Sequence, residues 1–161
     1  MLSRIISMGA DPRTAANIIQ TLADLPEFLR KSMIRSRLLE FYSMSDTDKH
    51  ETISSSLAAL PSLGSIKLKQ LMKTWLEVLL GLPGSQITDM FRVYCEEVLN
   101  NRGVVEKIDI GSIIDVFLSL QEWEKEKLSD CLKEVIFSFP NKTDVLSVIP
   151  QPLLKLLTIM P

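Results

Sequence analysis

The residues best suited to bind a ligand or a partner form a dense basic cluster in the segment LRKSMIRSR. Arg30, Lys31, Arg35 and Arg37 stand there with no acid among them. On a helix, Lys31 and Arg35 are one turn apart and Arg30 and Arg37 are two turns apart, so we expect a broad basic band. Such a band can meet phosphates or an acidic protein, or it can be a solvated face that pairs with neighbouring glutamates.

Residues for nucleophilic or metal chemistry are scarce. The one histidine, His50, lies in the polar stretch SDTDKHETISSSL, which favours a solvated helix residue over a ligand or base. One imidazole cannot build a His-pair zinc site. Cys95 and Cys131 are 36 residues apart without a Cys-x-x-Cys pair, which argues against a zinc ribbon and a redox dithiol. We expect Cys131 to be a small buried apolar residue.

Acid–base catalysis and phosphate binding have little support in the sequence. The carboxylates Glu96 and Glu97, or Asp109 and Asp115, could act as a pair, but their settings are typical of exposed helix residues. The six glycines form neither a phosphate-binding loop nor a Gly-x-Ser-x-Gly elbow. We therefore expect no enzyme, no catalytic residue, no cofactor and no metal.

Apolar periodicity predicts that helices position the basic cluster. In PEFLRKSMIRSRLLEFYSM the apolar residues recur near every 3.6 positions, so the cluster lies on a helix. Ser45, Ser65 and Ser85 each precede another helical pattern and are expected to cap it. Asn100 to Gly103 form the strongest break in the chain. We interpret the following GVVEKIDIGS as an extended connector, because a lone strand has no partner.

A phrase of three apolar residues and a proline recurs along the chain. The spacing i, i+4, i+7 followed by proline places the three side chains on one stripe of a helix, and the proline removes the amide that would continue it. We expect five amphipathic helices that stop in this way. The phrases are Ile18-Leu22-Leu25-Pro26, Ile53-Leu57-Leu60-Pro61, Trp75-Leu79-Leu82-Pro83, Leu132-Ile136-Phe139-Pro140 and Leu153-Leu157-Met160-Pro161.

The segments FYSMSDTDKHETISSSL and FLSLQEWEKEKLSDCL can also be laid together with a one-residue gap, which leaves an internal duplication open.

The segment IDIGSIIDVFLSLQEWEKEKLSDCLKEVIFSFP resembles the small helical repeats of the cytosolic N domain of MgtE-type magnesium transporters and of the flagellar switch protein FliG. The resemblance covers residues 105–161 well and the first hundred loosely. It implies stacked helices and a packing or regulatory surface, and it does not imply transport. Glu122, Glu124 and Glu126 are the nearest analogy to acidic magnesium ligands, but alternate residues of a helix point in different directions, which favours a solvated face.

Composition and charge bound the remaining possibilities. Apolar residues make up 46% and charged residues 24%, as in a globular protein. No apolar run is long enough to span a membrane, and MLSRIISMGADPR is too short in apolar residues for a secretory signal, so we expect a cytoplasmic protein. Residues 1–75 hold ten Lys or Arg against seven acids, and 76–161 hold eight against thirteen. The isoelectric point near 5.5 argues against a nucleic-acid binder.

The C-terminal VLSVIPQPLLKLLTIMP contains one charge, Lys155. It either completes the core, which we favour, or presents an apolar surface to a partner helix or to a second copy of the chain.

Together these patterns predict one all-α domain over residues 1–161. It would be an irregular array of eight to ten short antiparallel helices, with two possible sub-layers, 1–101 and 104–161, that share a core. We expect a non-catalytic protein–protein interaction or scaffold module with a protein partner, and a homo-oligomer is possible. The alternative is a nucleic-acid-associated regulator that uses the basic helix at residues 30–37.

Overall fold

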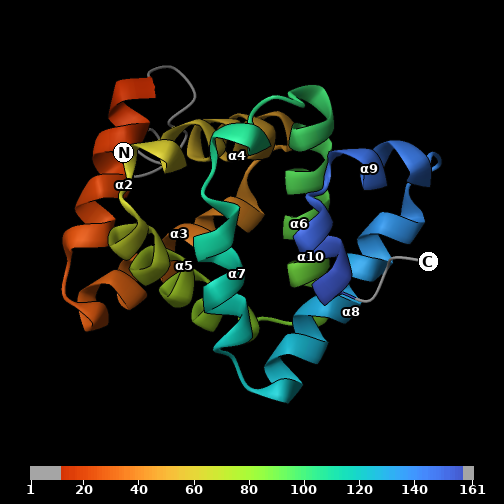
Figure 1. Ribbon diagram of the computed structural model, residues 1–161. Helices are drawn as coiled ribbons and strands as arrows, with labels where there is room; N and C mark the ends of the chain where they lie inside the picture. The colour runs from red at the N-terminus through yellow and green to blue at the C-terminus, as the bar shows by residue number, and fades with distance from the viewer. Residues whose placement is uncertain (1–11, 158–161) are drawn as a thin grey trace. The chain divides into compact units, whose positions relative to one another are not determined.

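The computed structural model describes residues 12–157, and all of its regular structure is helical (Figure 1). Within this range the chain forms nine α-helices and two 3₁₀ turns, without a strand. The prediction of an all-α fold of eight to ten helices is confirmed. The chain divides into two compact units at Leu79 and Leu80.

Unit 1 is built from four α-helices. Helix α2 (Pro12–Asp24) packs mainly against α4 (Asp46–Ala59) and also contacts α3 (Glu27–Ser43). The 3₁₀ turn η1 (Leu60–Ser62) leads into α5 (Ser65–Leu80), whose last residue begins unit 2. The inner side of α3 buries Ile34, Leu38 and Phe41, at the spacing of one helical stripe.

Within the described range, unit 2 contains two long helices and three shorter ones. Helix α6 (Gly84–Asn100) packs against α8 (Glu122–Ser138), and both contact α9 (Lys142–Val148). Between α6 and α8 lie the turn η2 (Val105–Lys107) and the nine-residue helix α7 (Ile110–Leu118). The core at the meeting point of α6, α8 and α9 contains Cys95, Val135, Ile136 and Val145.

The division at Leu79 and Leu80 differs from the sub-layers expected at residues 101–104. The break after Asn100 lies inside unit 2, because the helix before it packs against helices that follow it. The connector after this break is also not fully extended. Residues 105–107 form η2, and Asp109 then begins α7 by accepting the amide of Ser112 at 3.1 Å.

The recurring proline phrases end helices as predicted. Helix α2 stops two residues before Pro26, and α8 stops two residues before Pro140, because the residue that precedes a proline is disfavoured in helical geometry. The middle apolar residue of every phrase is buried, while its described neighbours are half-buried, except Ile53, which is also buried. These middle residues are Leu22, Leu57, Leu79, Ile136 and Leu157. Met160 and Pro161, which end the last phrase, lie outside the described residues.

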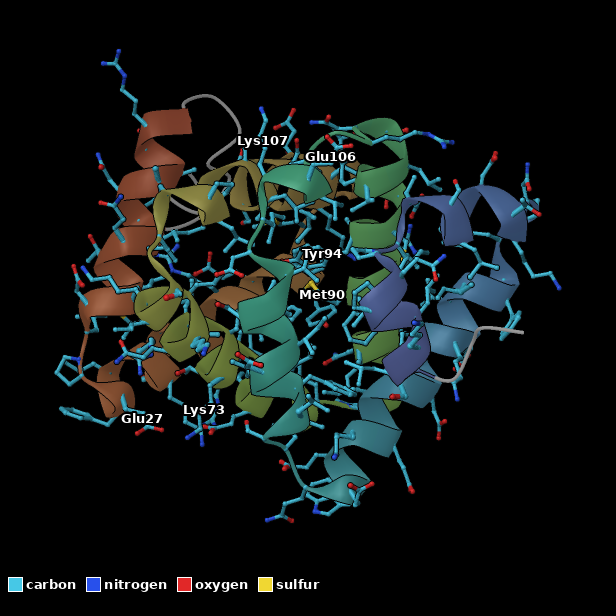
Figure 2. All side chains as sticks on the ribbon, in the orientation of Figure 1. Glu27, Lys73, Met90, Tyr94, Glu106 and Lys107 are labelled. Atoms are coloured by element: carbon cyan, nitrogen blue, oxygen red, sulfur yellow. The ribbon has the colours of Figure 1, made fainter. Side chains whose placement is uncertain are left out.

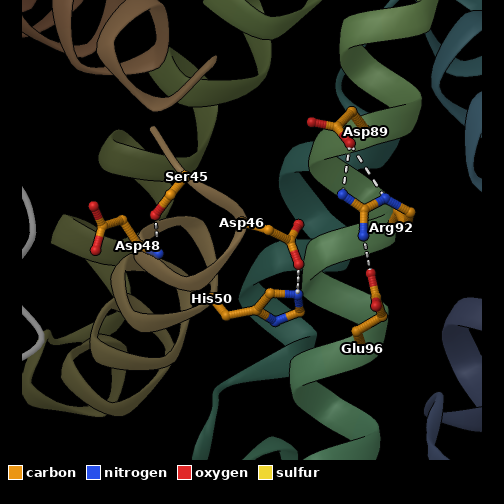
Figure 3. Close-up of polar contacts among 7 residues, drawn as sticks. All are labelled: Ser45, Asp46, Asp48, His50, Asp89, Arg92 and Glu96. Atoms are coloured by element: carbon orange, nitrogen blue, oxygen red, sulfur yellow. Dashed lines mark hydrogen bonds and ion pairs between the residues drawn. The ribbon is translucent and has the colours of Figure 1, made fainter. Parts of the chain in front are cut away.

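Two of the three expected serine caps are wrong. Ser45 does cap α4, since its hydroxyl accepts the amide of Asp48 (Figure 3). Helix α5, however, begins at Ser65 itself, after the carbonyl of Gly64 accepts the amide of Leu68. Helix α6 begins at Gly84, so Ser85 lies inside its first turn. Prolines and glycines before these helices set their starts earlier than the serines.

The C-terminal apolar segment folds as two short helices within the described range. They are α9 and α10 (Gln151–Leu156), separated by Pro150. Val145, Leu154 and Leu157 are buried, which confirms internal packing up to residue 157.

Candidate functional site

The basic cluster lies on α3 as predicted, but its members do not form one band. Arg30 is 6% exposed, whereas Arg35 is exposed and Lys31 and Arg37 are half-buried. The reason is the helical repeat: Arg30 precedes the buried Ile34 by four residues and therefore shares its inward stripe. The expectation that Arg30 belongs to an outer basic surface is therefore wrong.

Arg30 closes the end of α2 and joins α3 to α5. Its Nη1 donates hydrogen bonds to the carbonyls of Leu25 at 2.7 Å and Ala23 at 3.3 Å, and its Nε donates to Thr74 Oγ1 at 2.8 Å. The last carbonyls of a helix lack amide partners and carry the negative end of its dipole. Arg30 is thus a structural cation of the turn between α2 and α3.

The two remaining cations of the cluster's centre lie on the outer side of α3. Lys31 Nζ is 3.9 Å from Glu77 Oε2 of α5, a partly exposed ion pair. Arg35 follows one turn later and is exposed. An ion pair of this kind contributes little to stability, so both residues are available for contacts with a partner.

Arg37 has unsatisfied donors in a partly buried position. Its Nε and Nη1 are buried and have no hydrogen-bond partner among the described residues. Burial lowers the pKa of Arg37, while the nearby charge of Glu40 raises it. An unpaired buried guanidinium is costly, so this side chain is the least explained cation of the cluster.

The outward side of α3 carries several large apolar side chains. The apolar periodicity of the sequence alone did not distinguish them from the buried stripe of this helix. Phe28 is 73% exposed and Leu39 57%, and Leu29 and Met33 are also exposed. In helical projection these four span about 140°, with Lys31 and Arg35 along one edge and Arg37 along the other. We call Phe28, Leu29, Met33 and Leu39 the α3 outer face. In the sequence, the signal that these four residues face outward is their angular offset around the helix from Ile34 and Leu38.

A second polar feature of unit 1 is a hollow of about 570 Å³ beside Arg30. Asp24, Glu27, Arg30 and Lys73 supply two charges of each sign to its lining. Glu27 and Lys73 project from the same edge of unit 1 in Figure 2. Arg30 Nε and Nη1 are already bound to hydroxyl and carbonyl oxygens, so these donors are not available to a ligand in this hollow.

The carboxylates considered for catalysis serve the helices. Glu96 pairs with Arg92, which also donates to Asp89 (Figure 3). Asp109 caps α7 and additionally accepts the hydroxyl of Ser112 at 2.7 Å.

Two of the three glutamates of α8 and the single histidine make contacts at or within their own helices, while Glu126 is exposed. Glu124 accepts the amide of Gln121 at 2.9 Å, and Glu122 pairs with Lys125 at 2.8 Å. His50 Nε2 is 3.6 Å from Asp46 Oδ2 one turn away (Figure 3). Across residues 12–157, histidines, cysteines and carboxylates do not gather in any group of three able to hold a metal ion.

Both cysteines are free and buried in unit 2. Cys131 lies in the core side of α8, as predicted, with its Sγ 3.9 Å from the carbonyl of Gly84. Burial, and then the charge of Glu96, raise the pKa of Cys95 to about 12, so it is a neutral thiol at physiological pH. Burial also raises the pKa of Tyr94, one residue earlier and labelled in Figure 2.

Two further findings complete the description. Among the described residues, none of the helices combines the length and the apolar character that a membrane crossing requires. Comparison with known proteins finds no matching family model, no matching curated protein and no matching solved structure. The resemblance to the MgtE N domain and to FliG stays a prediction.

Proposed function

We propose that this chain is a non-catalytic protein–protein interaction module that uses the α3 outer face. The single observation that carries the proposal is the concentration of exposed apolar side chains on one side of one helix, Phe28, Leu29, Met33 and Leu39. Large exposed apolar side chains that share one helical side with polar residues among and beside them are typical of a binding site.

The flanking charges indicate what kind of partner fits. Lys31 and Arg35 line one edge of the α3 outer face, and Arg37 lines the other. Glu40 projects among the apolar residues and lowers this positive charge. An amphipathic helix with apolar anchors and acidic residues along its sides complements such a surface.

The nucleic-acid alternative loses support from the position of Arg30. Phosphate binding scales with the number of accessible cations, and Arg30 is occupied inside unit 1. Free thiols at Cys95 and Cys131 are compatible with a reducing compartment, and we place the module in the cytoplasm.

Photo-crosslinking in the cells of origin tests the proposal. A photoreactive amino acid replaces Leu39 of the α3 outer face, and the matched control replaces Ser54, an exposed residue of α4. We expect a discrete protein adduct from position 39 and none from position 54. The Arg35→Glu variant should reduce the adduct at least about tenfold, because it puts a like charge beside an acidic partner.

Each other outcome has a defined meaning. Equal adducts from both positions, or none from either, would contradict a binding role for the α3 outer face. An adduct of the chain with itself would reassign this face to a homo-oligomer contact. An adduct removed by nuclease would favour the nucleic-acid alternative.

A further inference from the structure

A hollow of about 220 Å³ lies between α2 and α3, on the side of Arg37. Its lining combines three apolar side chains, three neutral polar side chains and one cation. The seven residues are Ile18, Leu22 and Met33, then Thr14, Asn17 and Thr21, and Arg37. This volume accommodates a group of a few heavy atoms and is too small for a nucleotide or a folded element.

The cation in this lining has unmet hydrogen-bonding capacity. Arg37 Nε and Nη1 are shielded from solvent and find no acceptor among the described residues. The loss of hydration lowers the pKa of Arg37 despite the opposing charge of Glu40, which does not line the hollow. Burying donors without acceptors costs free energy, and a turn of the guanidinium toward the hollow would let an acceptor there recover it.

The lining also defines the charge of the acceptor. Among the described residues that line the hollow, Arg37 is the one ionisable group, so a single negative charge neutralises it. A doubly charged phosphate would keep an unmatched charge against Ile18, Leu22 and Met33. The hydroxyl of Thr21 already donates to the carbonyl of Asn17 at 2.8 Å, so the guanidinium is the charged donor and the Asn17 side-chain amide can be a neutral one.

We propose that this hollow is a binding site for a monocarboxylate with a short apolar stem. The carboxylate would accept from the Arg37 guanidinium, and the stem would contact Ile18, Leu22 and Met33. A carboxylate of this kind has two possible sources, a small organic acid or an acidic side chain of a bound protein. The site does not depend on the proposed function, because the small-acid source needs no protein partner.

Titration with butyrate, followed through the Arg37 Nε–H resonance, tests the site in the unaltered protein. We expect a saturable shift with a dissociation constant on the order of 1 mM, as for a very small ligand. Butyramide has the same shape without the charge and should cause no such shift. A non-saturating shift equal to that caused by chloride would overturn the proposal and mean screening only.

Two charge-matched variants separate this site from the basic surface. Arg37→Gln should weaken butyrate binding at least about tenfold, since it removes a charged hydrogen-bond donor. Arg35→Gln removes the same charge two residues away on the exposed side and should leave the affinity within about twofold. Equal weakening by both variants would contradict a site at Arg37. Saturation of the Arg37 resonance in the unaltered protein decides the matter even if Arg37→Gln does not fold.

The source of the carboxylate is decided in a second titration. A short amidated peptide with one glutamate between leucines is compared with its glutamine counterpart. Stronger binding of the glutamate peptide than of butyrate assigns the hollow to a protein side chain, and weaker binding assigns it to a small acid. Failure of the crosslink at position 39 together with saturable butyrate binding would remove the proposed function and keep this site.

Discussion

The two Leu-Pro turns, LADLP in unit 1 and LLGLP in unit 2, each present two helix-end carbonyls to a cation. At the first turn Arg30 donates to Ala23 and Leu25, which lie three residues and one residue before Pro26. At the second turn Lys127 Nζ donates to Leu80 at 2.8 Å and Leu82 at 3.3 Å, at the same two positions before Pro83.

The turns differ in where the cation comes from. Arg30 is five residues beyond Leu25 and is buried, and it also binds Thr74 of α5. Lys127 comes from α8, 45 residues beyond Leu82, and is half-buried. The carbonyl positions follow from the proline, because it ends the helix and leaves them without amide partners. The packing between helices determines which side chain reaches these carbonyls.

Removing the buried cation should have the largest effect. Arg30→Met deletes the charged hydrogen bonds to Ala23 and Leu25 and leaves these carbonyls unsatisfied, so unit 1 should lose about 3 kcal/mol of unfolding free energy. Urea unfolding followed by Trp75 fluorescence, in a Trp123→Phe background, measures it. The control Arg35→Met should change stability by less than about 0.5 kcal/mol. A loss below about 1 kcal/mol for Arg30→Met would show that the turn does not need its cation.

Alkaline pH should weaken unit 2 through Cys95. Burial raises the pKa of this thiol in the folded chain from 9.0 to about 12, so the folded form holds its proton longer than the unfolded form. Below pH 9 the contribution of this protonated thiol to the unfolding free energy of unit 2 is fully present. It should then fall by up to about 1.4 kcal/mol per pH unit until about pH 12.

Unfolding of unit 2 as a function of pH, monitored by amide exchange of α6 and α8, checks this effect. Cys95→Ala should flatten the slope, leaving the part due to Tyr94, whose pKa burial also raises. An unchanged slope in Cys95→Ala would contradict the assignment to Cys95.

Removing the half-buried cation should have a smaller effect. Lys127→Met should cost unit 2 about 1 kcal/mol, because water can reach the carbonyls of Leu80 and Leu82 in place of Nζ. Amide exchange of α8 measures the change, and Lys127→Arg should retain most of the stability. A cost equal to that of Arg30→Met would mean that burial does not distinguish the two turns.

The smallest effect is expected at Arg37, whose Nε and Nη1 have no hydrogen-bond partner among residues 12–157. Arg37→Met should leave unit 1 unchanged or stabilise it by up to about 0.5 kcal/mol, since it replaces a poorly solvated charge by an apolar chain of similar length. The same urea experiment applies. Destabilisation above about 1 kcal/mol would show that Arg37 is held as Arg30 is, and would weaken the carboxylate site.

The features that the sequence predicted correctly are local. Helix stops at Pro26 and Pro140, and the cap at Ser45, depend on a few neighbouring residues. The placement of the apolar residues of each proline phrase on one helical stripe follows from spacing alone. These features required no knowledge of which helices meet.

The features that the sequence missed depend on packing between helices. Arg30 was expected at the surface because it is charged, although its spacing places it on the same helical stripe as Ile34 and Leu38. Lys127 had no local signal, since its partners at Leu80 and Leu82 are contributed by α5 and the turn after it. The division at Leu79 and Leu80 likewise follows from helix pairing, not from the strong break at Asn100.

The central claim is that α3 separates a structural inner cation, Arg30, from a binding surface on its outer side. The most direct test is the crosslink yield from position 39 in two variants, Arg30→Lys and Arg35→Glu, at a temperature where both are folded. We expect Arg30→Lys to keep the yield although it lowers the stability of unit 1, because the inner cation does not touch the partner. We expect Arg35→Glu to lose the yield at least about tenfold with little change in stability. Loss of the adduct in folded Arg30→Lys, together with its retention in Arg35→Glu, would contradict the claim.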